Sequence, residues 1–112
     1  MKSTWQSILY KLETYTLNQF HPEGGQKANW FARALGFTPA NKELLARQII
    51  FDPKKAEPVR INEFGIIYLQ YATIVGANGR IIEGVRLHWI KERNTTLIRL
   101  TNVLPPKRRA QK

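Results

Sequence analysis

The sequence is poor in residues that several common chemistries require. It has no cysteine, one methionine and eight acidic residues in 112 positions. Without cysteine, neither disulfide bonds nor thiolate metal sites can hold the fold together. No run of about 18 apolar residues is present to cross a bilayer, and the first residues lack the apolar core of a signal peptide. We therefore expect a soluble protein without a membrane anchor.

The shortage of acidic and nucleophilic side chains further limits the kinds of reaction that the chain could catalyse. Asp52 is the only aspartate, the glutamates are scattered, and the only histidines are His21 and His88. Metal-dependent nucleases need clustered carboxylates or histidines, which argues against a bound metal ion. The only serines, Ser3 and Ser7, fall in the first expected helix and give a serine nucleophile little support. We expect no metal and no small-molecule cofactor.

Positive charge is what the chain has in excess. Eighteen lysines and arginines face the eight acidic residues, which gives a net charge of +10. Such a domain repels itself, and its usual partner is a polyanion, most often nucleic acid. An anionic membrane surface is the alternative, but no long basic amphipathic helix is present to lie on it. Hydrophobic residues make up 43% of the chain, and we expect one monomeric domain over residues 1–112.

The first half of the chain, residues 1–52, predicts helices. Ser3 can cap a first helix, whose apolar stripe is Trp5, Ile8, Leu9 and Leu12. Residues 14–18 are β-branched and aromatic, which predicts a short extended link. A central helix then carries Lys27 on its first turns and ends at Gly36, which suits a left-handed cap.

A third helix is expected after the turn that follows Gly36. Asn41 can cap it, and Asp52-Pro53 ends it. Its apolar residues are Leu44, Leu45, Ile49 and Ile50.

The second half, residues 59–104, predicts a sheet. Strands are expected at residues 59–62, 66–75, 80–91 and 96–104, with a Gly-Ala-Asn-Gly hairpin turn at 76–79. Three helices followed by such strands predict an α+β domain, with the N-terminal helices packed on one face of a three- or four-stranded antiparallel meander. Residues 105–112 form a basic tail, in which Lys107-Arg108-Arg109 is expected to be an electrostatic arm.

Strand alternation assigns the sheet residues to two faces. Val85, Leu87 and Trp89 should face the helices, and Arg86 and His88 should face solvent. Arg99 and Thr101 of the last strand are expected on the same solvent face, and Tyr68 and Gln70 are candidates to join them. Nine basic residues from Arg80 to Lys112 face only two glutamates. This surface is therefore expected to attract phosphates, although any wet sheet face carries polar residues.

These residues suit metal-free RNA cleavage. His21 precedes the central helix and Lys27 lies in its first turns, at the positive end where a phosphate can bind. The alternative is that His21-Pro22 only begins the helix and that Lys27 is a solvated surface charge. Cleavage needs a base for the 2′-OH proton, an acid for the 5′-oxygen, and cations for the charge on phosphorus. Histidine fills either proton role near neutral pH.

Three segments resemble a known family of toxin domains. They are YTLNQFHPEGGQKANWFARALGF, ANGRIIEGVRLHWI and RLTNVLP. They are similar to small C-terminal domains of bacterial polymorphic and contact-dependent inhibition toxins, whose layout resembles the barnase–EndoU–colicin–RelE group of metal-free ribonucleases. The resemblance covers most of residues 15–105 and implies helices before a curved antiparallel sheet that cleaves RNA.

The resemblance assigns roles to individual residues. It implies a catalytic set of His21, Lys27, Arg86, Arg99 and Thr101, with Asn102 as the alternative to Thr101. Trp89 is then either core or a base-stacking residue, and with His88, Tyr68 and Arg80 it completes the expected substrate-binding set. The implied partners are RNA, including transfer RNA, and an acidic immunity protein. The domain would act in the bacterial cytoplasm, expressed there or delivered as part of a secreted toxin.

Two other functions fit the same residues. A non-catalytic nucleic-acid-binding module would use the same basic face, and its affinity would come from phosphate contacts that persist without His21. An interaction protein would dock an acidic partner protein there instead.

Overall fold

The computed structural model describes residues 5–22 and 25–107, and it confirms the α+β fold class. The proposed Ser3 cap and the tail residues Arg108 and Arg109 lie outside these ranges. The helical elements are α1 Trp5–Lys11, the π-helical turn η1 Leu12–Thr16, α2 Gly25–Leu35, the 3-10 turn η2 Pro39–Asn41, and α3 Lys42–Ala46. The strands are β1 Glu57–Asn62, β2 Gly65–Val75, β3 Ile81–Glu92 and β4 Ile98–Leu104.

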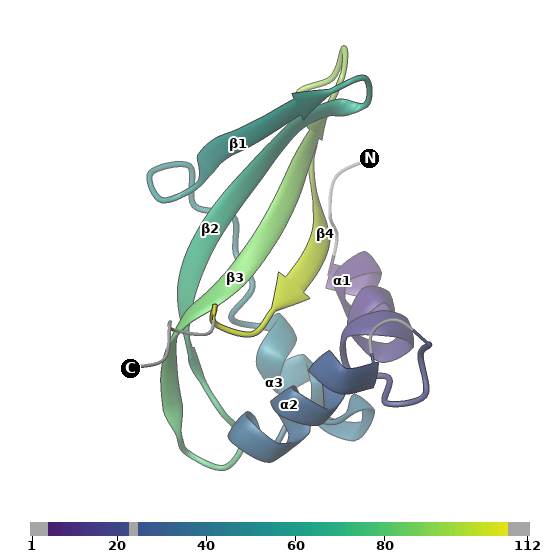
Figure 1. The fold of residues 1–112 in the computed structure, drawn as a ribbon, viewed down its shortest axis with the longest axis vertical. Helices are drawn as coiled ribbons and strands as arrows, with labels where there is room; N and C mark the ends of the chain where they lie inside the picture. The colour runs from purple at the N-terminus through teal and green to yellow at the C-terminus, as the bar shows by residue number, and fades with distance from the viewer. Residues whose placement is uncertain (1–4, 23–24, 108–112) are drawn as a thin grey trace.

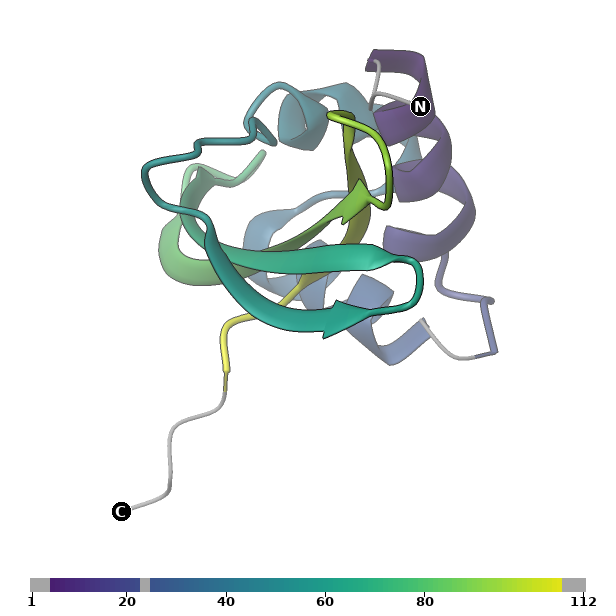
Figure 2. The ribbon, with the colours of Figure 1, turned by 90° about the horizontal axis from the view of Figure 1, so that it is seen from above.

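The four strands form one antiparallel meander in the order β1-β2-β3-β4. Val75 pairs with Ile81 across the expected hairpin turn, where the Gly76 N–H donates to the Arg80 carbonyl at 2.7 Å. Figure 1 shows the helices gathered toward one end of the sheet, with α1 beside β4, while the opposite end of the strands extends beyond them. Figure 2 shows that the sheet is strongly curved. No helix within the described residues is long and apolar enough to span a membrane.

The core lies between the helices and one face of the sheet. Val85, Leu87 and Trp89 are at most 2% exposed, which confirms the predicted parity of β3. From the helices, buried apolar residues pack against them, among them Leu12, Phe31, Leu35 and Leu45. Gly36 has a φ of +74° directly after α2, which confirms the left-handed cap.

Tyr68 and Gln70 do not join the solvent face, and that expectation is wrong. Directly opposite residues in an antiparallel pair share a face, and Tyr68 lies opposite Trp89 while Gln70 lies opposite Leu87. Gln70 is only 4% exposed, and burial is tolerated because its amide is paired at both ends. Its Nε2 donates to the Ile50 carbonyl at 3.0 Å, and its Oε1 accepts from the Asp52 N–H at 3.1 Å.

The extended link expected at residues 14–18 is also wrong, because α1 continues into η1. The Thr14 hydroxyl donates to the Tyr10 carbonyl at 2.8 Å, which lets a β-branched residue sit in a helical turn. Leu12 and Thr16 are buried in this turn, so tertiary packing outweighs local propensity. Trp5, expected in the core stripe, is 44% exposed at the start of α1.

The third helix is shorter than predicted. It ends at Ala46, so Ile49 is buried beyond it and Ile50 is 67% exposed. Asn41 makes no side-chain cap for α3; its Oδ1 accepts from the Thr38 N–H at 2.8 Å. That bond closes the preceding 3-10 turn, so the capping side chain acts one turn earlier than expected.

Candidate active site

A β-bulge shapes the face of the sheet that is turned away from the core. His88 pairs with Asn102 and Trp89 pairs with Leu100, so Thr101 is an extra residue in β4. In a bulge two residues oppose one, and both Thr101 and Asn102 therefore lie against the His88 position. The Thr101 hydroxyl donates to the His88 carbonyl at 3.1 Å, which holds the bulge in place.

The bulge borders a hollow of about 340 Å³. We call it the His88 hollow; its lining residues are Val59, Arg60, Ile67, His88, Thr101 and Asn102. Every strand contributes to it, which the curvature visible in Figure 2 makes possible. His88 alternates with Leu87 and Trp89, which are buried against the helices, so the hollow opens on the face opposite the core.

Cations from three separate elements act on the His88 imidazole. Its pKa is lowered from the ordinary value, first because the ring is partly buried and then because of the charges of Arg86, Arg60 and Lys27. Arg86 is held in place by a 2.9 Å bond from its Nε to the Pro105 carbonyl. Lys27 lies in the first turn of α2, and its charge has the smallest effect of the three.

His88 should therefore titrate below about 6.5, the ordinary histidine pKa. Arg86→Gln should move the pKa upward but not fully to that value, because burial is the larger cause. Since folding lowers this pKa, its stabilising contribution is complete above about pH 6.5 and is lost as the pH falls toward the folded-state pKa. NMR titration of the imidazole protons measures both effects, and a wild-type pKa at or above 6.5 would contradict this account.

His21 lies at the start of α2, as the sequence suggested. Its carbonyl accepts from the N–H of Gly25, the first residue of α2, at 3.0 Å, and Lys27 follows in the first turn. Its ring packs edge-on against Tyr15, with ring centroids 4.6 Å apart. The ring contact therefore fixes His21 against η1.

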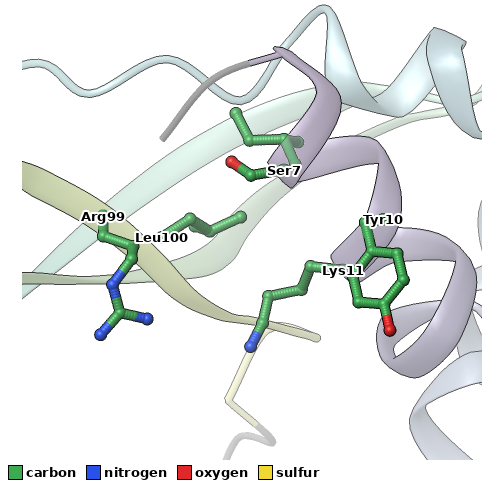
Figure 3. Close-up of a pocket in the computed structure, with 6 residues that line it drawn as sticks. Ser7, Tyr10, Lys11, Arg99 and Leu100 are labelled. Atoms are coloured by element: carbon green, nitrogen blue, oxygen red, sulfur yellow. The ribbon is translucent and has the colours of Figure 1, made fainter. Parts of the chain in front are cut away.

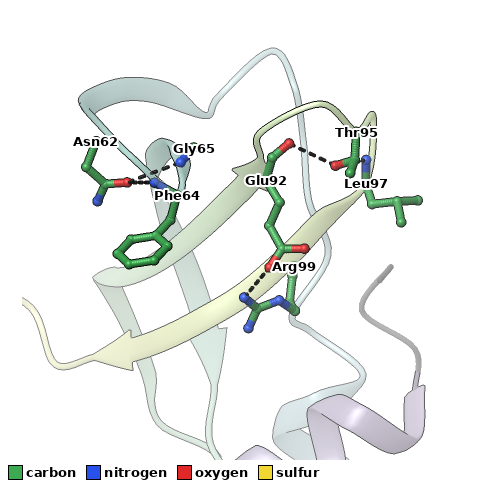
Figure 4. A network of polar contacts seen from close by, with 7 residues as sticks. All are labelled: Asn62, Phe64, Gly65, Glu92, Thr95, Leu97 and Arg99. Carbon is green, nitrogen blue, oxygen red and sulfur yellow. Dashed lines mark hydrogen bonds and ion pairs between the residues drawn. The ribbon is translucent and has the colours of Figure 1, made fainter.

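Arg99 does not line the His88 hollow. Its Nη2 donates to Glu92 Oε2 at 2.6 Å, near the β3–β4 turn that is also closed by Thr95 and Glu92 (Figure 4). Arg80 is also remote, because it lies in the β2–β3 turn. It is eight residues from His88, roughly 25 Å along an extended strand.

Of the two roles left open for Trp89, the structure favours core over base stacking. Trp89 is 2% exposed, and its ring packs edge-on against Phe51 at 5.4 Å. Tyr68 also packs against Phe51, with ring centroids 6.1 Å apart. Trp89 is buried in the core, and Tyr68 is partly buried against it.

Arg60 is a site residue that the sequence reasoning missed. It lies on β1 opposite Ile67, and both residues line the hollow. The signal was the alternation of Val59, Arg60, Ile61 and Asn62, but a short edge strand does not reveal which face it presents. Within the described residues, no group of three or more histidines, aspartates and glutamates is placed to hold a metal ion.

The chain matches a protein-family model over most of its length. Residues 8–107 match a family described as a domain of unknown function, DUF6883. The match spans every strand and most of the helical half, including the residues around the His88 hollow. The comparison with curated proteins found no match, and neither did the comparison with solved structures.

Proposed function

Since the chain belongs to the DUF6883 family, whose description assigns no activity, we propose from the site itself that it is a metal-independent endoribonuclease. Two observations carry the proposal: a hollow lined by His88, Arg60 and Thr101, and the charges of Arg86, Arg60 and Lys27 that lower the pKa of the His88 imidazole. Cations so placed suit a phosphate, and a histidine kept neutral near pH 7 suits a proton acceptor.

The proposed reaction is transesterification by the 2′-OH of the RNA. His88 takes the 2′-OH proton, the 2′-oxygen forms a bond to phosphorus, and the bond from phosphorus to the 5′-oxygen breaks. Lys27 and Arg86 stabilise the added negative charge. Thr101 lines the hollow, and its hydroxyl keeps the bulge in place by donating to the His88 carbonyl. His21, at the start of the same helix as Lys27, supplies the proton to the leaving 5′-oxygen. The products are a 2′,3′-cyclic phosphate and a 5′-OH.

We further propose that the domain is a toxin that acts on RNA in the bacterial cytoplasm. Support comes from the resemblance of the His-Pro and Lys-Ala segment to toxin domains and from the net charge of +10. An acidic immunity protein would inhibit the domain by binding the same cations that bind the RNA phosphate.

The test is incubation with total bacterial RNA in EDTA, followed by a denaturing gel. The wild type and the control Lys54→Gln, which removes a charge from the loop before β1, should produce discrete fragments with cyclic phosphate ends. Lys27→Gln and Arg86→Gln should produce far fewer fragments in the same time, although circular dichroism should match the wild type. If the RNA stays intact but shifts on a native gel, the ribonuclease proposal is wrong. The domain is then better described as a non-catalytic nucleic-acid-binding module.

A further inference from the structure

A second basic pocket lies at the seam between α1 and β4. Its volume is about 180 Å³, and its lining residues are Ser7, Ile8, Tyr10, Lys11, Arg99 and Leu100. Figure 3 shows Lys11 reaching from the helix and Arg99 from the strand, with their charged ends on the same side of the seam. We call this the seam pocket.

The cations of the seam pocket are close enough to repel each other. The pKa of Lys11 is lowered from its ordinary value, first by burial and then by the charge of Arg99. The ion pair with Glu92 uses Nη2 of Arg99, and a guanidinium has five N–H donors in total. An anion in the pocket would offset the repulsion and could accept hydrogen bonds from both side chains.

The seam pocket and the His88 hollow both include residues of β4. Arg99 lines the pocket and Thr101 lines the hollow. Residues two apart on a regular strand are separated by about 6.6 Å, and the bulge at Thr101 alters this spacing locally. Successive phosphates of one extended nucleic-acid strand could therefore reach the two sites in turn.

We propose that the seam pocket binds a second phosphate of the same single-stranded RNA whose scissile phosphate lies in the His88 hollow. Lys11 acts as a point charge and Arg99 as a directional donor to this phosphate. The proposal rests on the proposed function, since that function supplies the RNA. It makes β4 the strand along which the substrate backbone runs.

The test measures binding separately from cleavage. The probe is a 2′-O-methyl RNA dodecamer, which cannot be cleaved by its own 2′-oxygen, and its affinity is measured at several salt concentrations. Lys11→Gln and Arg99→Gln should each weaken binding and reduce the slope of log affinity against log salt by about 0.7, the value for one lost single-strand phosphate contact. Lys11→Arg, which keeps the charge, and the control Lys54→Gln should retain the wild-type slope.

A 2′-O-methyl dinucleotide, which has one internucleotide phosphate, distinguishes this pocket from the hollow. Its affinity should be unchanged in Lys11→Gln and lowered in Arg86→Gln. Because Arg99→Gln removes the ion pair with Glu92, the double variant Arg99→Gln/Glu92→Gln repeats the measurement without that carboxylate.

The outcomes separate the two proposals. If Lys11→Gln and the double variant keep the wild-type salt slope while the wild type cleaves RNA, the seam pocket proposal is overturned and the ribonuclease stands. If both lose slope while the wild type leaves RNA intact, the second phosphate site stands and the ribonuclease fails.

Discussion

His88→Ala is expected to lower the rate constant of RNA cleavage by a factor of about 10² to 10⁴, the range for losing a general acid or base. RNA affinity should change little, because Lys27, Arg60 and Arg86 remain and phosphate contacts dominate binding. Single-turnover cleavage of a defined RNA in EDTA gives the rate constant, and a nitrocellulose filter assay with the 2′-O-methyl analogue gives the affinity.

The pH dependence of the same reaction provides an independent check. If His88 is the base, kcat/KM should rise with pH through the His88 pKa of the free enzyme and fall again at higher pH, where the general acid loses its proton. That pKa lies below about 6.5 because burial and then the three cations disfavour the imidazolium. Arg86→Gln should move the rising limb to higher pH.

His21→Ala discriminates between the two histidines. If His21 supplies the leaving-group proton, this variant should lose rate without shifting the rising limb of the pH profile. If His88→Ala retains the wild-type rate and His21→Ala does not, the base belongs to the loop before α2, and the assignment of His88 is wrong.

Phe31→Ala is expected to lower the free energy of unfolding by about 3–5 kcal/mol, the range for truncating a buried phenylalanine. Phe31 has no exposed surface and packs edge-on with Trp30, with ring centroids 5.0 Å apart. Domains of this kind have about 5–15 kcal/mol of stability, so the loss is a large share of the total. Urea denaturation followed by tryptophan fluorescence measures it.

Phe20→Ala is the matched control for this change. It removes the same atoms from a side chain that is 92% exposed, so the expected effect is within about 0.5 kcal/mol. Phe31 lies one helical turn after Lys27, on the same side of α2. Loosening α2 should therefore also raise the pKa of His88. Equal urea midpoints for the two variants would show that Phe31 does not anchor α2 to the sheet.

Periodicity in the sequence predicted most of the sheet and its core. Val85, Leu87 and Trp89 alternate with Arg86 and His88, and alternation has only one parity that buries the apolar set. Helix boundaries were less predictable. Thr14 has the propensity of a strand residue, yet its hydroxyl donates to a carbonyl of the preceding helical turn. The burial of Leu12 also stabilises the continuation of the helix into η1.

The pairing of β2 with β3 could not be read from either strand alone. Tyr68 and Gln70 have polar atoms that suit a wet face, but the register sets them opposite Trp89 and Leu87. Register depends on contacts between strands, whereas alternation is a property of one strand. The bulge at Thr101 has the same origin, since no local signal in β4 marks the extra residue.

The sequence by itself determined the class of fold, the excess of positive charge and the residue types available for chemistry. Only the tertiary structure decided which of them meet: Lys27 from α2 and Arg60 from β1 act on His88, while Arg99 pairs with Glu92 beside Lys11. The physical reason is the distance along the chain over which each effect acts. Propensity and periodicity act over a few neighbouring residues, but a site is made where curvature, register and helix docking bring distant residues together.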